Sequence, residues 1–229
     1  MGRRRQPPPV PTTGIFEDHF NTGALDTTKW TVSTWNAPQG GKFQADRVSC
    51  AFGMLGMRLT QDSNKLSIGG EITLKRLCGF GTYEWQAKAS STAPTPNVLG
   101  SPVSGSVTGL FNYVGDSDTE LDLEVEGCRP NLVQATTWHS VGMPNENTQY
   151  PIQAPLSDAF HSYKYVWAPG KVQYYFNGIL FATHTRNVPT APAYPMINHW
   201  GTNNANWGGV ATPNVDRWLW VSMFRFTPL

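Results

Sequence analysis

Residues 119–127 read TELDLEVEG, so acidic residues alternate with aliphatic ones along one short run. Successive side chains of a β-strand point to opposite faces. The run therefore predicts a strand that buries Leu121, Leu123 and Val125 and presents its acids on one face; these acids are Glu120, Asp122, Glu124 and Glu126. A fold keeps such a row of like charges only if something offsets the repulsion, such as a cation, raised pKa values or a ligand that uses the acids.

Short runs with the period of a β-strand recur along the rest of the chain between turn clusters, and helical periodicity is nearly absent. The sharpest hairpin signal is Asn177-Gly178, which separates two such runs as a type I′ turn requires. Segments 91–105 and 187–195 are expected to be loops because they are rich in turn-forming residues. The expected strands are residues 29–34, 57–60, 71–77, 82–89, 107–114, 120–126, 133–138, 161–167, 172–176, 179–184 and 218–226.

This pattern predicts an all-β sandwich of two packed antiparallel sheets, with one face of the acidic strand buried and the other open. All 229 residues except the first 14 are expected to form a single domain, residues 15–229. Residues 1–14 are basic and then proline-rich, which predicts a disordered arm or a remnant of cloning and no secretion signal. Five aromatic residues are expected in the core, namely Trp85, Tyr163, Trp167, Tyr175 and Trp218.

Charge and composition argue against several kinds of partner. The net charge of +1 provides no basic field for nucleic acid. No apolar run approaches the roughly 20 residues of a membrane-spanning helix, so no membrane partner is expected, and we expect a monomer. Cys50, Cys78 and Cys128 allow at most one internal disulfide and match no zinc spacing, so the redox compartment stays open.

The acids suit one kind of chemistry in particular. Two carboxyl groups that flank a glycosidic bond break it when one protonates the leaving oxygen and the other attacks the anomeric carbon or activates water. Glu120 and Glu124 are separated by roughly 13 Å of extended backbone, which does not decide between retaining and inverting geometries. Two alternatives remain for the same residues: they could be a set of calcium ligands, or they could form an exposed acidic strand without a chemical role.

Several motifs together resemble glycoside hydrolase family 16. TELDLEVEG resembles the family's E-[LIV]-D-[LIV]-E-F-x-G strand, and GFGTYEWQAKAS (79–90) resembles its G-[YF]-G-x-[YF]-E-x-[RK]-x-K segment. GLFNYVG (109–115), residues 160–184, PMINHWG (195–201) and WVSMFRF (220–226) follow in the family's order. The resemblance extends from about residue 15 to the C-terminus.

The resemblance implies a concanavalin-like β-jelly roll with a sugar cleft on its concave sheet. It implies that Glu120 is the nucleophile, that Glu124 is the acid that later acts as the base, and that Asp122 assists them. Glu126 has no catalytic counterpart in the family, and we expect it to be a solvated or paired edge charge.

The resemblance also implies a set of sugar-binding residues, since pyranose rings stack on flat aromatic side chains and bond to a few placed polar groups. Asn198 and Trp200 match positions near the cleavage point. The other expected substrate contacts are Phe111, Tyr113, Trp138, Glu71 and Asn36. His139 is expected to be a scaffold group and not a catalyst.

Three departures from the family pattern bear on substrate and metal. Thr73 stands where many members have an arginine, and Asp118-Thr119 replaces an aromatic residue before the first catalytic acid. Ser222 replaces an aspartate that commonly helps to bind a structural calcium, so the C-terminal strand does not support that ion, and no cofactor is expected. The E-x-D-x-E form without an insertion resembles that of lichenases and xyloglucan-active members of the family, and this resemblance favours a mixed-linkage or related β-glucan.

The resulting hypothesis is a secreted, retaining, endo-acting glycoside hydrolase of β-1,3-1,4- or β-1,3-linked glucan. Its extracellular location is inferred from the size of a polysaccharide substrate. Two alternatives stay open: a transglycosylase acting on β-glucan or xyloglucan, and a non-catalytic, lectin-like carbohydrate-binding module.

Overall fold

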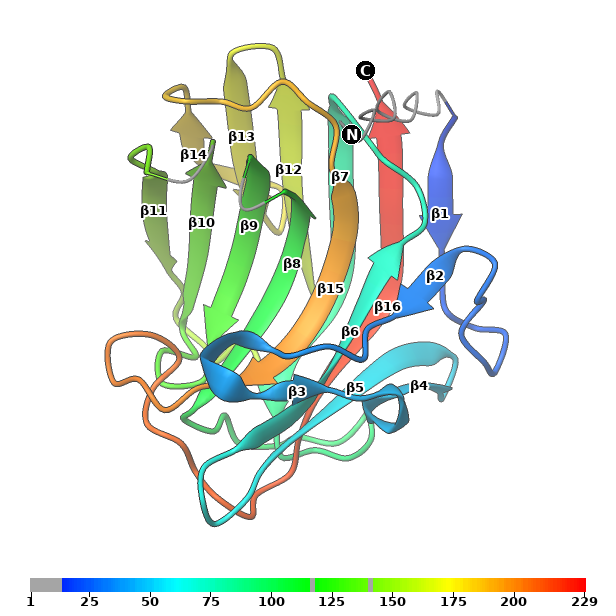
Figure 1. Ribbon diagram of the computed structural model, residues 1–229, viewed down its shortest axis with the longest axis vertical. Coiled ribbons are helices and arrows are strands. Elements are labelled where there is room, and N and C mark those ends of the chain that lie inside the picture. The colour runs from blue at the N-terminus through cyan, green and yellow to red at the C-terminus, as the bar shows by residue number, and fades with distance from the viewer. Residues whose placement is uncertain (1–13, 116–117, 140–141) are drawn as a thin grey trace, which may run out of the picture.

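A computed structural model describes residues 14–115, 118–139 and 142–229, and its chain folds into two stacked β-sheets (Figure 1). The predicted arm lies outside these residues except for Gly14. Two short 3-10 helices, η1 (Pro38–Gly40) and η2 (Ala45–Arg47), are the only helical segments within the described ranges. The predicted all-β sandwich is therefore confirmed.

The front sheet contains the acidic strand at its centre. Its order is β11 (Glu146–Pro151), β10 (Leu132–Trp138), β9 (Thr119–Glu126), β8 (Ser106–Val114), β15 (Tyr194–Gly201), β6 (Ser67–Leu74) and β2 (Trp30–Val32). All of these neighbours are antiparallel. The short strand β3 (Lys42–Phe43) adds to β6 in parallel.

The back sheet lies behind the front one in Figure 1. Its order is β4 (Val48–Ala51), β5 (Met54–Gln61), β16 (Arg217–Pro228), β7 (Gly81–Ser91), β12 (His161–Ala168), β13 (Lys171–Phe176) and β14 (Ile179–His184), and β1 (Phe16–Asp18) pairs with the end of β16. Strand β5 also pairs with β6, where Thr60 lies opposite Ile68 and Gln61 lies opposite Ser67, and this pairing joins the two sheets.

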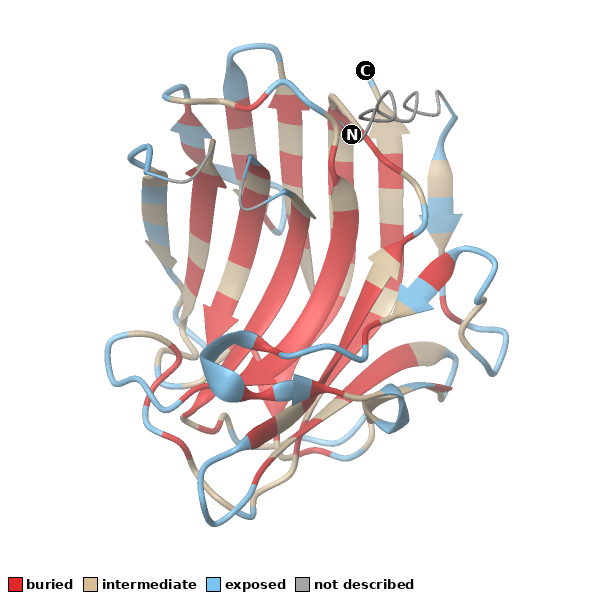
Figure 2. Ribbon diagram, in the orientation of Figure 1, coloured by how far each residue is buried: buried red, intermediate tan, exposed pale blue. Residues whose placement is uncertain are grey.

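The hydrophobic core fills the space between the sheets, and burial concentrates on their central strands (Figure 2). Leu121, Leu123 and Val125 of β9 all enter this core, as the alternation predicts. The back sheet contributes most of the large rings, including Trp85 and Trp167, which are fully buried. Because the aliphatic face of β9 is anchored there, its other face is fixed toward the outside of the front sheet.

The predicted hairpin turn is also confirmed. Asn177 and Gly178 both have positive φ, +46° and +80°, as a type I′ turn requires, and they join β13 to β14.

Two expected core residues are placed differently. Tyr175 is half-buried on the outer face of β13, where its ring lies 4.5 Å from Lys164 Nζ, because the alternation of that strand buries Val172, Tyr174 and Phe176 instead. Trp218 is also half-buried, since it alternates with the buried Arg217 and Leu219 at the start of β16. Trp85, Tyr163 and Trp167 are buried as expected.

The cysteines form no disulfide in the described structure: Cys50, Cys78 and Cys128 are all free thiols. Cys50 and Cys78 are buried, and burial raises the pKa of the Cys50 thiol to about 11 and that of Cys78 to about 12. These two groups are therefore inert small apolar residues of the interior, whereas Cys128 is exposed.

Candidate active site

The strand register lines up polar side chains in rows across the open face of the front sheet. Glu120 pairs with Trp138 of β10 and Tyr113 of β8, and Asp122 pairs with Thr136 and Phe111. Glu124 begins a third row, which continues through Gly109 of β8 and Asn198 of β15 to Glu71 of β6. The three predicted catalytic acids therefore share one face with the predicted sugar-binding residues.

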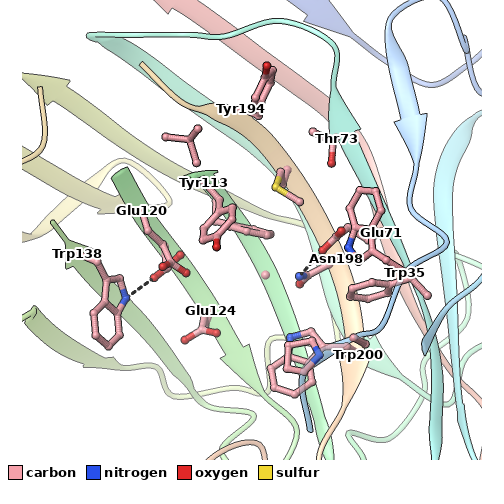
Figure 3. A pocket seen from close by; sticks show the side chains of 18 of the residues that line it. Trp35, Glu71, Thr73, Tyr113, Glu120, Glu124, Trp138, Tyr194, Asn198 and Trp200 are labelled. Atoms are coloured by element: carbon pink, nitrogen blue, oxygen red, sulfur yellow. Dashed lines mark hydrogen bonds between the residues drawn. The ribbon is translucent and has the colours of Figure 1, made fainter. Parts of the chain in front are cut away.

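These rows form the floor of a cleft of about 880 Å³. Figure 3 shows Glu120, Glu124 and Trp138 on one side of the cleft, with Asn198, Glu71 and Trp35 across from them. The structure brings all ten predicted site residues to its walls: Asn36, Glu71, Phe111, Tyr113, Glu120, Asp122, Glu124, Trp138, Asn198 and Trp200.

Glu124 is built to hold a proton at neutral pH. Burial raises the pKa of this carboxyl to about 8, and the nearby negative charges of Glu126 and Glu120 add to the effect. A hydrogen bond from the Trp207 side chain acts in the opposite direction. Gln134 also donates to Glu124 Oε2 over 3.5 Å. A carboxyl group in this state is a general acid near pH 7.

Asp122 is held at the centre of the row. It is buried, and its indole partner Trp138 donates from Nε1 to Oδ2 over 3.0 Å. Burial, followed by the charges of Glu120 and Glu124, raises the pKa of Asp122 well above its ordinary value. Raised pKa values on two members of the row thus offset the like-charge repulsion that the sequence implies.

Across the cleft, Glu71 is fixed by its neighbours. Ser33 Oγ donates to Glu71 Oε1 over 2.7 Å, and Asn198 Nδ2 donates to Oε2 over 3.1 Å. Burial raises the pKa of Glu71, while hydrogen bonds from Ser33, Asn198 and Trp35 oppose this shift. Asn198 Oδ1 is buried and makes no hydrogen bond within the chain.

Gly109 keeps the space between the two walls open. A Cβ atom at this position would lie 2.4 Å from Asn198 Oδ1, which is well inside van der Waals contact. The absence of a side chain between Glu124 and Asn198 therefore gives the cleft its depth.

The aromatic residues differ from the sequence-based picture in their exposure. Trp200 is only 3% exposed and packs among Ala37, Phe43 and Val107, so only a small part of its ring reaches the cleft. Trp35 is 52% exposed at the rim, and Trp207 lies edge-on to Trp200 with 4.8 Å between ring centroids. Both line the cleft, and both were missed because they lie in segments without strand periodicity.

Glu126 was expected to be either a solvated or a paired edge charge, and it is not solvated. It is 1% exposed, its side chain forms an ion pair with Arg129, and it accepts a hydrogen bond of 2.5 Å from Gly208 N. The other expected state, a paired charge, is what the structure contains.

The structure places the residues of the three departures from the family pattern in different surroundings. Thr73 lines the cleft, and its buried hydroxyl group makes no hydrogen bond within the chain. Thr119 is buried and donates to Ala191 O over 3.0 Å, so it tethers the 187–193 loop. Ser222 donates to Gln86 O over 3.4 Å, and the described residues contain no cluster of three or more His, Cys, Asp or Glu side chains that could hold a metal. No helix within the described part of the chain is long and apolar enough to span a bilayer.

A family model and several known proteins are similar to this chain in sequence. The model of glycosyl hydrolases family 16 matches residues 39–216, well over half of the chain. A beta-glucanase of Paenibacillus polymyxa is 27% identical over 212 residues, which cover 89% of this chain and 79% of that protein. Endo-1,3-1,4-beta-glycanase ExoK of Rhizobium meliloti is 29% identical over 226 residues, which cover 93% of this chain and 78% of that protein.

The fold has solved counterparts as well. The structure of a Bacillus licheniformis beta-glucanase matches with a TM-score of 0.82 at 23% identity, covering 95% of this chain and all of that one. A laminarinase catalytic domain from Thermotoga petrophila matches with a TM-score of 0.76 at 17% identity, covering 92% of this chain and 95% of that one. The jelly-roll architecture is therefore shared with enzymes of both names.

Proposed function

Because the chain belongs to glycosyl hydrolase family 16, we propose that it cleaves β-1,3-1,4- or β-1,3-linked glucan internally, by a retaining double displacement. The relatives named above are glucanases, and the chain covers more than three quarters of the length of each. The observation that carries the proposal is the row of Glu120, Asp122 and Glu124 along the wall of the cleft.

In the first step Glu120 attacks the anomeric carbon, and Glu124 donates its proton to the leaving oxygen. The bond to the leaving sugar breaks as the bond to the Glu120 carboxylate forms. The raised pKa of Glu124 suits this step because the acid still holds its proton near neutral pH.

In the second step Glu124, now ionised, removes a proton from water, and the resulting nucleophile displaces Glu120 from the anomeric carbon. Two inversions restore the original β configuration. A protonated Asp122, held by Trp138, stabilises the negative charge that returns to the row when Glu120 leaves. The reaction needs only carboxyl groups and water.

The cleft walls would hold the sugar by two kinds of contact. The exposed faces of Trp35, Trp207 and Trp138 offer stacking surfaces for pyranose rings. The amide of Asn198 and the carboxyl group of Glu71, which bond to each other and line the cleft, offer polar groups for sugar hydroxyls. We also propose that the enzyme works outside the cell as a monomer, since polymeric glucan does not cross membranes.

The test is incubation with lichenan, laminarin and xyloglucan, followed by measurement of reducing ends and product lengths. Internal hydrolysis of lichenan or laminarin produces a rise in reducing ends with mid-sized products from the start. Redistribution of chain lengths with little rise in reducing ends would replace hydrolysis by transglycosylation. Binding without turnover would leave only a carbohydrate-binding module.

A further inference from the structure

Glu126 lies two residues beyond Glu124 on the same face of β9, but a loop covers it. The segment 202–209 folds over this end of the cleft, and Gly208 N donates to Glu126 Oε2 over 2.5 Å. The position is therefore outside the space that substrate occupies, because Glu126 does not line the cleft.

Arg129 completes a grip on the same segment. Its Nη2 forms an ion pair with Glu126 and donates to Asn206 O over 3.4 Å. Glu126 and Arg129 thus hold the residues on either side of Trp207. We call Glu126, Arg129 and their bonds to Asn206 and Gly208 the loop clamp.

The residue between these two anchor points reaches the proton donor directly. The Trp207 side chain hydrogen-bonds to Glu124 and packs edge-on against the buried Trp200. The carbonyl group of Trp207 accepts from Thr202 Oγ1 over 2.7 Å, so a further bond holds the backbone at Trp207.

We propose that Glu126 is a positioning residue for proton transfer, which acts on Glu124 through the loop clamp and through its own negative charge. The inference rests on the proposed function, because it concerns the same acid. The loop clamp places the Trp207 donor. The negative charge of Glu126, two residues further along β9, favours the protonated form of Glu124.

The surroundings of Glu124 separate this effect from others. The titratable groups that face it from the described strands are Glu120 and Asp122 on β9, Tyr113 on β8 and Glu71 on β6. The facing residues of β10 and β15 are uncharged, namely Gln134, Thr136, Trp138, Asn198 and Trp200. Glu126 itself is contacted by two titratable groups, Arg129 and the thiol of Cys128, whose Sγ donates to Glu126 Oε2 over 3.7 Å. Arg129 is the cation of the loop clamp, so its removal should act with the sign opposite to removal of Glu126.

The experiment is the pH profile of kcat/KM on lichenan for Glu126→Gln, Arg129→Gln and the double variant. Glu126→Gln keeps an acceptor for Gly208 but loses the charge, so the alkaline limb should move down by about 0.5–1 pH unit. Arg129→Gln should move it up by a few tenths of a unit, and the double variant should return it toward the wild-type position. Movement of both single variants in the same direction, or an unmoved limb in Glu126→Gln, overturns the inference.

One further variant separates the effect of the Glu126 charge from that of its hydrogen bond to Gly208, and another serves as a control. Glu126→Asp keeps the charge but shortens the reach to Gly208, so kcat should fall several-fold without a downward shift of the limb. Glu146→Gln is the matched control, because Glu146 also accepts backbone N–H bonds, from Thr185 and Arg186, and pairs with an arginine, but on β11. Its pH profile should match wild type, and a shift equal to that of Glu126→Gln would contradict the inference.

A readout that needs no turnover separates failure of this inference from failure of the proposed function. In protein labelled with ¹³C at glutamate carboxyl groups, NMR titration follows Glu124, whose signal is assigned by its loss in Glu124→Gln. A lower Glu124 midpoint in Glu126→Gln supports the inference even if no glucan is hydrolysed, and an unchanged midpoint overturns it. If Glu126→Gln does not fold, Arg129→Gln decides the question, because the Arg129 side chain is half-exposed. An upward shift of the Glu124 midpoint in that variant supports the inference, and no shift overturns it.

Discussion

Trp138 lies directly opposite Glu120 in the β9–β10 ladder, yet its indole Nε1 donates to Asp122 Oδ2, one row away, over 3.0 Å. One side chain therefore provides both a wall for the cleft beside the predicted nucleophile and the donor that holds the middle acid. The next residue on the same face of β9 is Glu124, so a change at Trp138 tests the coupling of the row.

Trp138→Phe keeps a flat ring but removes the N–H donor. Loss of one hydrogen bond to a buried carboxyl group costs about 1–3 kcal/mol, so kcat should fall roughly tenfold or more. Because the ring remains, KM on lichenan should change little, whereas Trp138→Ala should raise it. Equal effects of the two variants on KM would show that the ring is not a sugar contact.

Glu124→Gln should stabilise the protein at neutral pH. The carboxyl group has an ordinary pKa of 4.5 and one of about 8 in the fold, so between these values the folded state binds more protons than the unfolded state. Stability therefore falls as pH rises through this window, and the amide, which does not titrate, avoids that loss. The expected gain at pH 7 is about 1–3 kcal/mol.

Thermal melting at pH 5 and pH 8 measures this effect: wild type should lose more Tm between the two than Glu124→Gln does. For Glu146, burial acts to raise the pKa, but backbone hydrogen bonds from Arg186 and Thr185, with the nearby positive charges, outweigh it and the pKa is lowered. Glu146→Gln should therefore lose stability at pH 7. A Glu124→Gln variant that melts below wild type at pH 8 would contradict the raised pKa.

Replacement by alanine should affect substrate binding at Trp35 and stability at Trp200. Trp35 is half-exposed at the rim, so Trp35→Ala should raise KM by up to about tenfold with little change in Tm. Trp200 is buried in its own small cluster, so Trp200→Ala should lower stability by about 3–5 kcal/mol. Melting curves and KM for both variants check the contrast, which fails if Trp35→Ala unfolds the protein as readily as Trp200→Ala.

Gly109→Ala should reduce activity by displacing Asn198. The added methyl group would lie 2.4 Å from Asn198 Oδ1 and would push the amide away from Glu71. We expect kcat/KM to fall at least tenfold, and Asn198→Ala in the Gly109→Ala background to add little further loss. Fully additive losses would mean that the two residues act independently.

The sequence was sufficient to predict the row of acids and much of the sandwich, for a physical reason. The alternation of Leu121, Leu123 and Val125 with acids is set by the pleat of one strand, and Asn177-Gly178 meets the backbone requirement of one turn. Such features are local, so they are visible without the fold.

Other features were missed because they depend on tertiary contacts. The expected strand 71–77 is observed as Ser67–Leu74, since Gly69 and Gly70 weaken the strand signal; a Cβ at Gly69 would lie 2.1 Å from His199 O. The polar strand β11 has no apolar alternation and pairs only at an edge. Trp207 reaches Glu124 from a loop whose path is set by Glu126 and Thr202.

The most direct test of the proposed mechanism is to trap the intermediate with a 2-deoxy-2-fluoro β-glucosyl or laminaribiosyl fluoride and to locate the adduct by tandem mass spectrometry. Fluorine at C2 slows both steps, while the good leaving group lets the first proceed, so the glycosyl-enzyme accumulates. The expected result is one glycosyl unit bonded to Glu120. An adduct on Glu124, or hydrolysis with inverted configuration and no adduct, would contradict the mechanism.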